Sequence, residues 1–280
     1  TVLGYKALYT VTDAGHDNIA IGFEAGKNLT TADQCVFVGS YAGGSGTITG
    51  DLNTGIGRRA CYSLTSGTSN TAVGGNAMDA TSTASNNTAV GVNALTSNTT
   101  GGSNTAVGFS ALDACSTGGE NAAFGYQAGK ATTVNHLAAF GYRALASNTT
   151  GSSNTAVGHQ ALENCTTGDN NTGLGQNAGS ASSPSGNITT GDNNFVLGNN
   201  SVANLYCADT SISSSDARDK TDVEDFKYGL SWITELRPVT YRWDKRSWYG
   251  EGYEKGTPDG SKKRDRLHIG FIAQEAIEVE

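Results

Sequence analysis

The sequence Asn-Thr-Ala-Val-Gly stands at residues 70–74 and again at 104–108, and variants of it recur through the first 200 residues. When the glycine of each repeat is position 0, successive glycines lie 16 to 18 residues apart, with one final interval of 23. The twelve glycines are Gly4, Gly22, Gly39, Gly57, Gly74, Gly91, Gly108, Gly125, Gly141, Gly158, Gly175 and Gly198. This period is too short for helix pairs or propeller blades and suits one turn of a β-solenoid. The sequence therefore predicts a mainly β fold in which residues 1–205 form a solenoid shaft of about twelve turns.

The residues beside each glycine predict which side chains fill the coil. Position −1 is apolar in all twelve repeats, as at Val73 and Val90, and position −3 shares its face because side chains alternate along a strand. We expect that face to point inward and the small residues at −2, such as Ala72 and Ala89, to face a neighbouring chain. Position +3 is Ala in eleven repeats and +4 is often Leu or Gly, which predicts a second short strand across the core.

Asparagine recurs at position −4. Stacked in register, the amides can hydrogen-bond from one turn to the next, and asparagine also tolerates the turn that begins a strand. We expect this column to be structural and not a binding site. Its nine members are Asn18, Asn53, Asn70, Asn87, Asn104, Asn121, Asn154, Asn171 and Asn194.

A thin coil buries little apolar surface by itself, so the alanine and glycine face predicts contact with further copies of the chain. We expect a homotrimer. The Ala, aliphatic, Gly pattern resembles the left-handed β-roll of trimeric adhesin heads and the repeat shafts of phage tail fibres, over most of residues 1–205.

An ice-binding solenoid is one alternative, because a threonine column occupies position −3. These threonines share a face with the aliphatic position −1 and are therefore expected to point inward, which disfavours ice binding. They are Thr54, Thr71, Thr88, Thr105, Thr155 and Thr172.

Composition excludes several classes of partner. The net charge is −8 with no basic stripe, so no nucleic acid is expected, and no apolar run is long enough to insert in a membrane. No cofactor or metal is expected, since His268 has no ligand companions at suitable spacing. The cysteines are expected to be small fillers of the core and not disulfides; they are Cys35, Cys61, Cys115, Cys165 and Cys207.

The composition changes near residue 210. Residues 1–210 carry 6 Lys or Arg and 12 Asp or Glu, whereas residues 211–280 carry 12 and 14 together with all three tryptophans. We expect a linker at 206–214 and a small α+β domain at 215–280, with a helix over about 225–236 that ends before Pro238 and a strand through Tyr241 and Trp243.

Three segments of this second piece carry a family resemblance. They are Ser-Asp-Ala-Arg-Asp-Lys at 215–220, Leu-Arg-Pro-Val-Thr-Tyr-Arg-Trp at 236–243 and His-Ile-Gly-Phe-Ile-Ala-Gln-Glu at 268–275. In this order they resemble the intramolecular chaperone domain at the C-termini of phage endosialidases and tail fibres, the S74 peptidase family. That domain normally continues well past the third segment, so residues 215–280 are expected to hold an incomplete chaperone.

The resemblance implies a chaperone that trimerises the chain, assists folding of the upstream β-structure and then releases itself by a single cut. Carried onto this sequence, Ser215 is the nucleophile, Lys220 is the base and the bond between Ser214 and Ser215 is cut. A lysine can act as base only when neutral, which requires burial or cationic neighbours that lower its pKa. The shaft itself is not expected to be an enzyme.

These features together predict the distal part of a phage tail fibre or tailspike. It would be assembled in the host cytoplasm, reside in the virion and contact a glycan or protein on the host surface. A cellular trimeric surface adhesin is the alternative, and the shaft of a polysaccharide-degrading tailspike with an upstream catalytic domain is a weaker one. The chain begins at Thr1 without a methionine or signal, which predicts a fragment of a longer protein.

Overall fold

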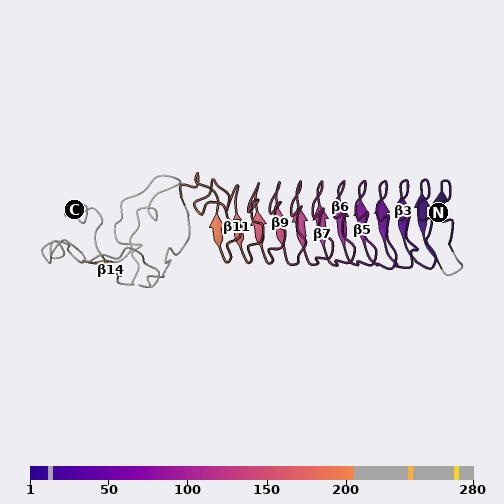
Figure 1. Ribbon diagram of the computed structural model, residues 1–280, viewed down its shortest axis with the longest axis horizontal. Coiled ribbons are helices and arrows are strands. Elements are labelled where there is room, and N and C mark those ends of the chain that lie inside the picture. Colours follow the sequence, from indigo (N-terminus) through magenta and orange to yellow (C-terminus); the bar gives the residue numbers. More distant parts are fainter. Residues whose placement is uncertain (12–14, 205–238, 242–267, 271–280) are drawn as a thin grey trace, which may run out of the picture. The chain divides into compact units, whose positions relative to one another are not determined.

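The computed structural model describes residues 1–11, 15–204, 239–241 and 268–270. The chain divides into two compact units, Thr1–Tyr206 and Cys207–Glu280. In the first unit, twelve short strands form one parallel sheet in sequence order, one strand per repeat (Figure 1). They are β1 (Val2–Leu3), β2 (Ile19–Ile21), β3 (Val36–Val38), β4 (Thr54–Ile56), β5 (Thr71–Val73), β6 (Thr88–Val90), β7 (Thr105–Val107), β8 (Ala122–Phe124), β9 (Ala138–Phe140), β10 (Thr155–Val157), β11 (Thr172–Leu174) and β12 (Phe195–Leu197).

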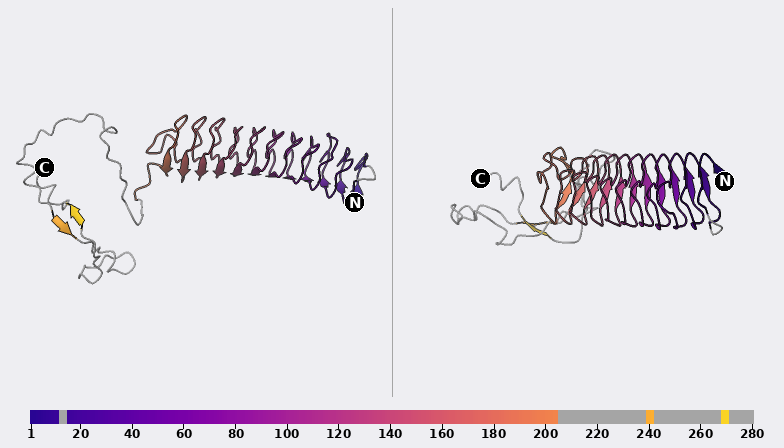
Figure 2. Two further views of the ribbon diagram at one scale, coloured as in Figure 1. Left: turned by 90° about the horizontal axis from the view of Figure 1, so that it is seen from below. Right: turned by 45° about the vertical axis from the view of Figure 1, so that its right-hand side comes forward.

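The strands stack in register, and the turn segments between them form the rest of each coil (Figure 2). Val73 pairs with Val90, and Val90 pairs with Val107, in successive parallel ladders. The predicted β-solenoid is therefore confirmed, with the repeat glycines marking its turns.

The predicted orientation of the strands is wrong. In β2 to β12 the middle residue, position −2, is the buried one, as Ala72 and Ala89 show at 0% exposure. The aliphatic residue at −1 points away from the interior, and Val90 is 38% exposed. The reason is space: leucines from the turn segment, such as Leu95 and Leu112, already fill the thin coil and belong to the same core cluster as the alanines. Position −2, which faces these leucines, therefore has room in most repeats only for the side chain of alanine or glycine.

The predicted second strand at positions +3 and +4 is also wrong. These residues lie in a turn in which positions +2 and +4 have positive φ, for example Asn93 at 57° and Leu95 at 54°. Because left-handed residues alternate with others here, successive backbone amides point to opposite neighbouring coils. The Asn93 amide donates to the Gly75 carbonyl of the preceding coil, and the Leu95 amide donates to the Ala111 carbonyl of the following coil. Left-handed conformation costs about 1–2 kcal/mol at leucine, which burial of its side chain offsets at about 1.5–3 kcal/mol.

One large side chain in the core shows how tightly its volume is balanced. Phe37 occupies position −2 of β3 and is fully buried. Three glycines surround its ring: a Cβ added to Gly43, Gly55 or Gly26 would lie 2.7, 3.0 or 3.3 Å from a ring carbon. The bulk of the Phe37 ring is thus accommodated by the absence of a side chain at these three surrounding positions.

The asparagine column is confirmed. The Asn70 side-chain amide donates to the Oδ1 of Asn53 at 3.0 Å, and the Asn87 side-chain amide donates to the Oδ1 of Asn70 at 3.1 Å. From Asn18 to Asn171, each Oδ1 of the column also accepts from a backbone amide of the next turn, as Asn104 Oδ1 does from the Asn121 backbone amide at 3.1 Å. The column thus ties adjacent coils through buried polar groups.

Replacement of Asn104 by alanine is expected to lower the free energy of unfolding by about 2–4 kcal/mol. The change leaves the Gly118 carbonyl without the amide that donates to it at 2.9 Å, and it removes the acceptor of the buried Asn121 amide. Urea unfolding of the full chain, followed by circular dichroism, measures this loss. The exposed Thr100→Ala change in the same coil is the control, expected to stay within about 0.5 kcal/mol. Equal unfolding midpoints for the two variants would contradict a structural role of the column.

In the second unit the structure describes two strands, β13 (Val239–Tyr241) and β14 (His268–Gly270), which pair antiparallel. Tyr241 of the predicted strand lies in β13, and Trp243 lies outside the described residues. The helix predicted over 225–236 and the linker at 206–214 lie outside the described residues.

Candidate functional site

The outer face of the sheet carries a continuous column of apolar side chains at position −1. In the middle of the shaft Val90, Phe124 and Phe140 are each 38% exposed, and Val157 is 43% exposed. Neither −1 nor −3 holds a charged side chain in any repeat. Contiguous apolar surface of this kind on a soluble protein marks an interaction site.

Aromatic rings occupy positions −1 and +1 in the centre of the shaft. Phe124 and Phe140 stack at position −1 with ring centroids 5.0 Å apart. At position +1, Tyr126 stacks on Phe109 at 5.3 Å and on Tyr142 at 5.2 Å. Because positions −1 and +1 flank one glycine, their Cα atoms lie within about 7 Å of each other. We call the outer stripe the column at −1 together with Val92, Phe109, Tyr126 and Tyr142 at +1.

The threonines at −3 lie on this same outer face. Thr71, Thr88 and Thr105 pair in successive ladders and are half-buried, while the alanines beside them are fully buried. The expectation that they point inward is wrong, and the argument it supplied against ice binding fails with it. The threonine column instead stands beside the apolar outer stripe.

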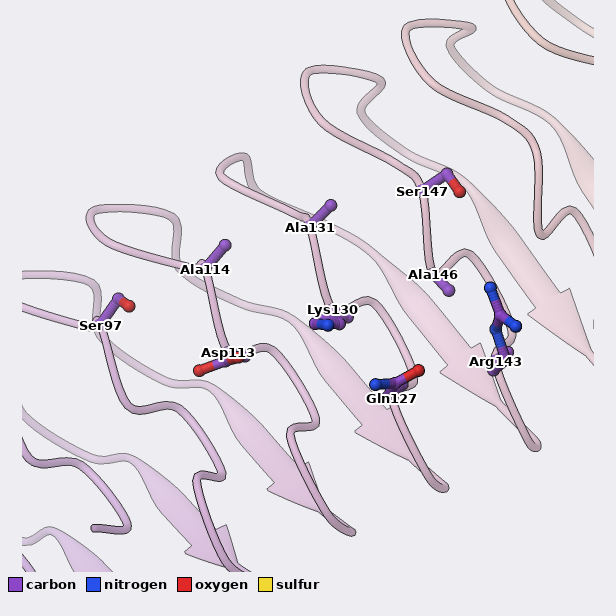
Figure 3. A pocket seen from close by; sticks show the side chains of 9 residues that line it. All are labelled: Ser97, Asp113, Ala114, Gln127, Lys130, Ala131, Arg143, Ala146 and Ser147. Carbon is purple, nitrogen blue, oxygen red and sulfur yellow. The ribbon is translucent and has the colours of Figure 1, made fainter.

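A second surface lies on the turn side of the coils. An open pocket of about 550 Å³ spans several turns, and its lining residues come from turn segments and not from strands (Figure 3). Its polar groups include Asp113, Lys130 and Arg143. Burial raises the pKa of the Asp113 carboxyl, an effect that the nearby charge of Lys130 opposes. A smaller pocket of about 310 Å³ beside Arg59 and Asp79 repeats the arrangement.

Ion pairs on the turn side link adjacent coils. Arg59 contacts Asp79 at 2.9 Å, and Arg143 contacts Glu163 at 2.7 Å, each from position +2 to position +5 of the next repeat. The sequence holds this signal, because opposite charges recur at these two positions, but the prediction did not use it. The pairs place hydrophilic groups on the side of the shaft away from the sheet.

Four cysteines, Cys35, Cys61, Cys115 and Cys165, are buried and free, as expected for core fillers, and Cys207 lies outside the described residues. Burial raises the pKa of the Cys61 thiol to about 12 and that of Cys115 to about 11. A thiol reacts as its thiolate, so these two are poorly reactive at neutral pH.

The predicted catalytic residues Ser215 and Lys220, and the cleavage site at Ser214 and Ser215, lie outside the described residues. Within the described part of the chain, no cluster of three or more histidine, cysteine or acidic residues is arranged to hold a metal ion. Over the same residues, no helix has the length and apolar character needed to cross a membrane.

Comparison with known proteins places the C-terminal piece. Residues 215–280 match the S74 peptidase family, described as the chaperone of endosialidase. No curated protein and no solved structure matches the chain. A β-solenoid shaft followed by a domain of this kind fits a tail fibre with a C-terminal trimerisation chaperone.

Proposed function

We propose that this chain is the distal part of a phage tail fibre or tailspike, a structural and host-attachment protein of the virion. The observation that carries the proposal is the match of residues 215–280 to the endosialidase chaperone family, directly behind a solenoid shaft. The chaperone domain brings three chains together, the shafts fold against one another, and the chaperone is then released.

A parallel solenoid of this length has a physical reason to need such help. Its contacts lie between residues 16 to 23 positions apart or more, and each strand exposes a free edge until the next coil has formed on it. Chains that hold exposed apolar columns while folding are prone to aggregate. Linking three chains through a C-terminal module raises their local concentration and favours assembly in register.

Release is assigned to Ser215 and Lys220. Neutral Lys220 takes the hydroxyl proton of Ser215 as the oxygen attacks the Ser214 carbonyl carbon, and the amide bond breaks as its nitrogen gains a proton. Water then hydrolyses the resulting ester, leaving the Ser214 carboxylate and restoring the Ser215 hydroxyl. The reaction is single-turnover, and removal of the chaperone leaves the folded shaft kinetically trapped.

Host attachment is assigned to the turn side of the shaft. The pockets around Lys130 and Arg59 offer charged and hydrogen-bonding groups, which suit a polar receptor such as a surface glycan or protein. This side stays open when the outer face of the sheet is covered.

Removal of the chaperone tests the assembly role. A protein that carries residues 1–280 with a complete chaperone domain is expected to give soluble three-chain shafts. A chain that ends at Ser214 should yield at least about tenfold less trimer, because assembly then depends on bimolecular encounters. Native mass spectrometry of the soluble fraction measures both, with total expression as the control. Equal trimer yields would remove the chaperone role.

A further inference from the structure

We infer that the outer stripe is the surface by which three copies of this shaft pack together, in register about an axis parallel to the shaft. The inference deepens the proposed function, on which its trimer rests, by naming the interface. It also reverses the sequence-based expectation, since the alanine face is the core of each chain and the aliphatic face is the contact between chains.

The length of the stripe identifies the occupant. Position −1 is apolar in every repeat from Leu3 to Leu197, so the partner must offer apolar groups along the whole shaft. The stripe repeats once per strand, at about 4.8 Å. A second copy laid in parallel has that same spacing, and closed cyclic symmetry gives each copy an equivalent environment.

The distribution of charge supports this choice. The outer face at −1 and −3 has no charged side chain, and the +1 residues of the outer stripe are uncharged, although Arg58 is exposed at +1 nearer the N-terminus. The ion pairs Arg59–Asp79 and Arg143–Glu163 lie on turn segments. Interfaces exclude charge from their centre and keep it at the rim. Packing on the outer stripe buries the apolar columns of each chain and leaves the ion pairs in solvent.

The aromatic segment is the expected centre of the contact. The rings of Phe124 and Phe140 are stacked with an angle of 7° between their planes, so their conformations are already ordered within the single chain. Aromatic residues dominate interface energetics, and few rotatable bonds remain to be fixed here. Towards the C-terminal end of the stripe, from Val157 to Leu197, position −1 holds no aromatic residue.

The first test places charge in this centre. Phe124→Lys combined with Phe140→Lys is expected to weaken trimer formation at least about 100-fold, because six ammonium groups would meet at the axis. Ser97→Lys combined with Ala114→Lys adds the same charge at exposed turn positions and should leave the trimer intact. Sedimentation velocity gives the chain number, and circular dichroism checks that the coil remains folded.

A second test does not require the fold to tolerate lysine at these positions. In a Cys207→Ser background, Phe124→Cys should be joined between chains by a short bismaleimide, while Ala114→Cys should not. The buried native thiols, such as Cys61 and Cys115, give little background because burial raises their pKa. Cross-linking is read as a doubled chain mass on a denaturing gel.

The outcomes separate this inference from the proposed function. If the unsubstituted protein that carries a complete chaperone domain is not a trimer, the proposed assembly fails and the interface with it. If it is a trimer that survives both phenylalanine substitutions, or that cross-links through Ala114→Cys and not through Phe124→Cys, the outer stripe is the wrong surface. Loss of the trimer only in the Phe124 and Phe140 pair, with cross-linking at Phe124→Cys, supports it.

Discussion

A protein that carries residues 1–280 together with a complete chaperone domain is expected to separate into two fragments, one ending at Ser214 and one beginning at Ser215. Ser215→Ala and Lys220→Ala should each stay whole, with cleavage at least about 10,000-fold slower, because removing a nucleophile or its base eliminates most of the catalysis. Intact-mass measurement locates the cut to the residue.

Asp216→Asn is the matched control for this experiment. It lies between the nucleophile and the base in sequence but has no assigned part in proton transfer, so its cleavage should persist. A cut that persists in Ser215→Ala, or one mapped to another bond, would falsify the Ser–Lys mechanism. Trimer formation in the uncut Ser215→Ala protein is expected, since assembly precedes release.

The second large effect concerns two adjacent glycines. Gly74→Ala is expected to lower the free energy of unfolding by more than about 4 kcal/mol and to prevent accumulation of soluble shaft. Gly74 has a φ of 140°, and a Cβ there would lie 2.6 Å from the Gly91 carbonyl carbon and closer still to its oxygen. The carbonyl belongs to the next coil, so relief would require the stack to open.

Gly75→Ala is the control, one residue away. No atom lies within 4 Å of a Cβ at Gly75, and its φ is not in the left-handed region. Its unfolding midpoint should match that of the unsubstituted protein within about 0.5 kcal/mol. Similar losses in both variants would show that general glycine flexibility, and not close approach between coils, explains the repeat glycine.

The sequence predicts how the coils stack better than it predicts which strand residues face the core and which face outward. Glycine spacing and the Asn70–Asn87 column follow from periodicity and local turn chemistry, and both are confirmed. Orientation could not be read from alternation, because a three-residue strand such as Thr88–Val90 offers one apolar residue to each side. Hydrophobicity favours burying the valine, but the coil has room only for the alanine.

A further signal for the orientation was present and unused. At −1 the residue changes from Val107 to Phe124 while the buried alanine at −2 is kept, and the change that accompanies it, Thr105 to Ala122 at −3, is on the same exposed face. At −2 the single large residue, Phe37, coincides with glycines at Gly26, Gly43 and Gly55. Compensation of volume marks an enclosed position. The catalytic assignment of Ser215 and Lys220 has no such internal check, because it comes from the family resemblance alone.

The setting of Phe37 constrains how a shaft like this can change length over evolution. Gene segments that encode the Thr-Ala-Val coils at Thr71–Val73, Thr88–Val90 and Thr105–Val107 are nearly interchangeable, so duplicating or deleting one leaves each new neighbour with a partner of the same shape. If a duplication or deletion ended beside the coil of Phe37, the phenylalanine ring would pack against a coil that lacks the matching glycines, or those glycines would face an alanine. Natural lengthening and shortening of the shaft should therefore be confined to the uniform middle coils, with the Phe37 coil and its three glycines inherited together.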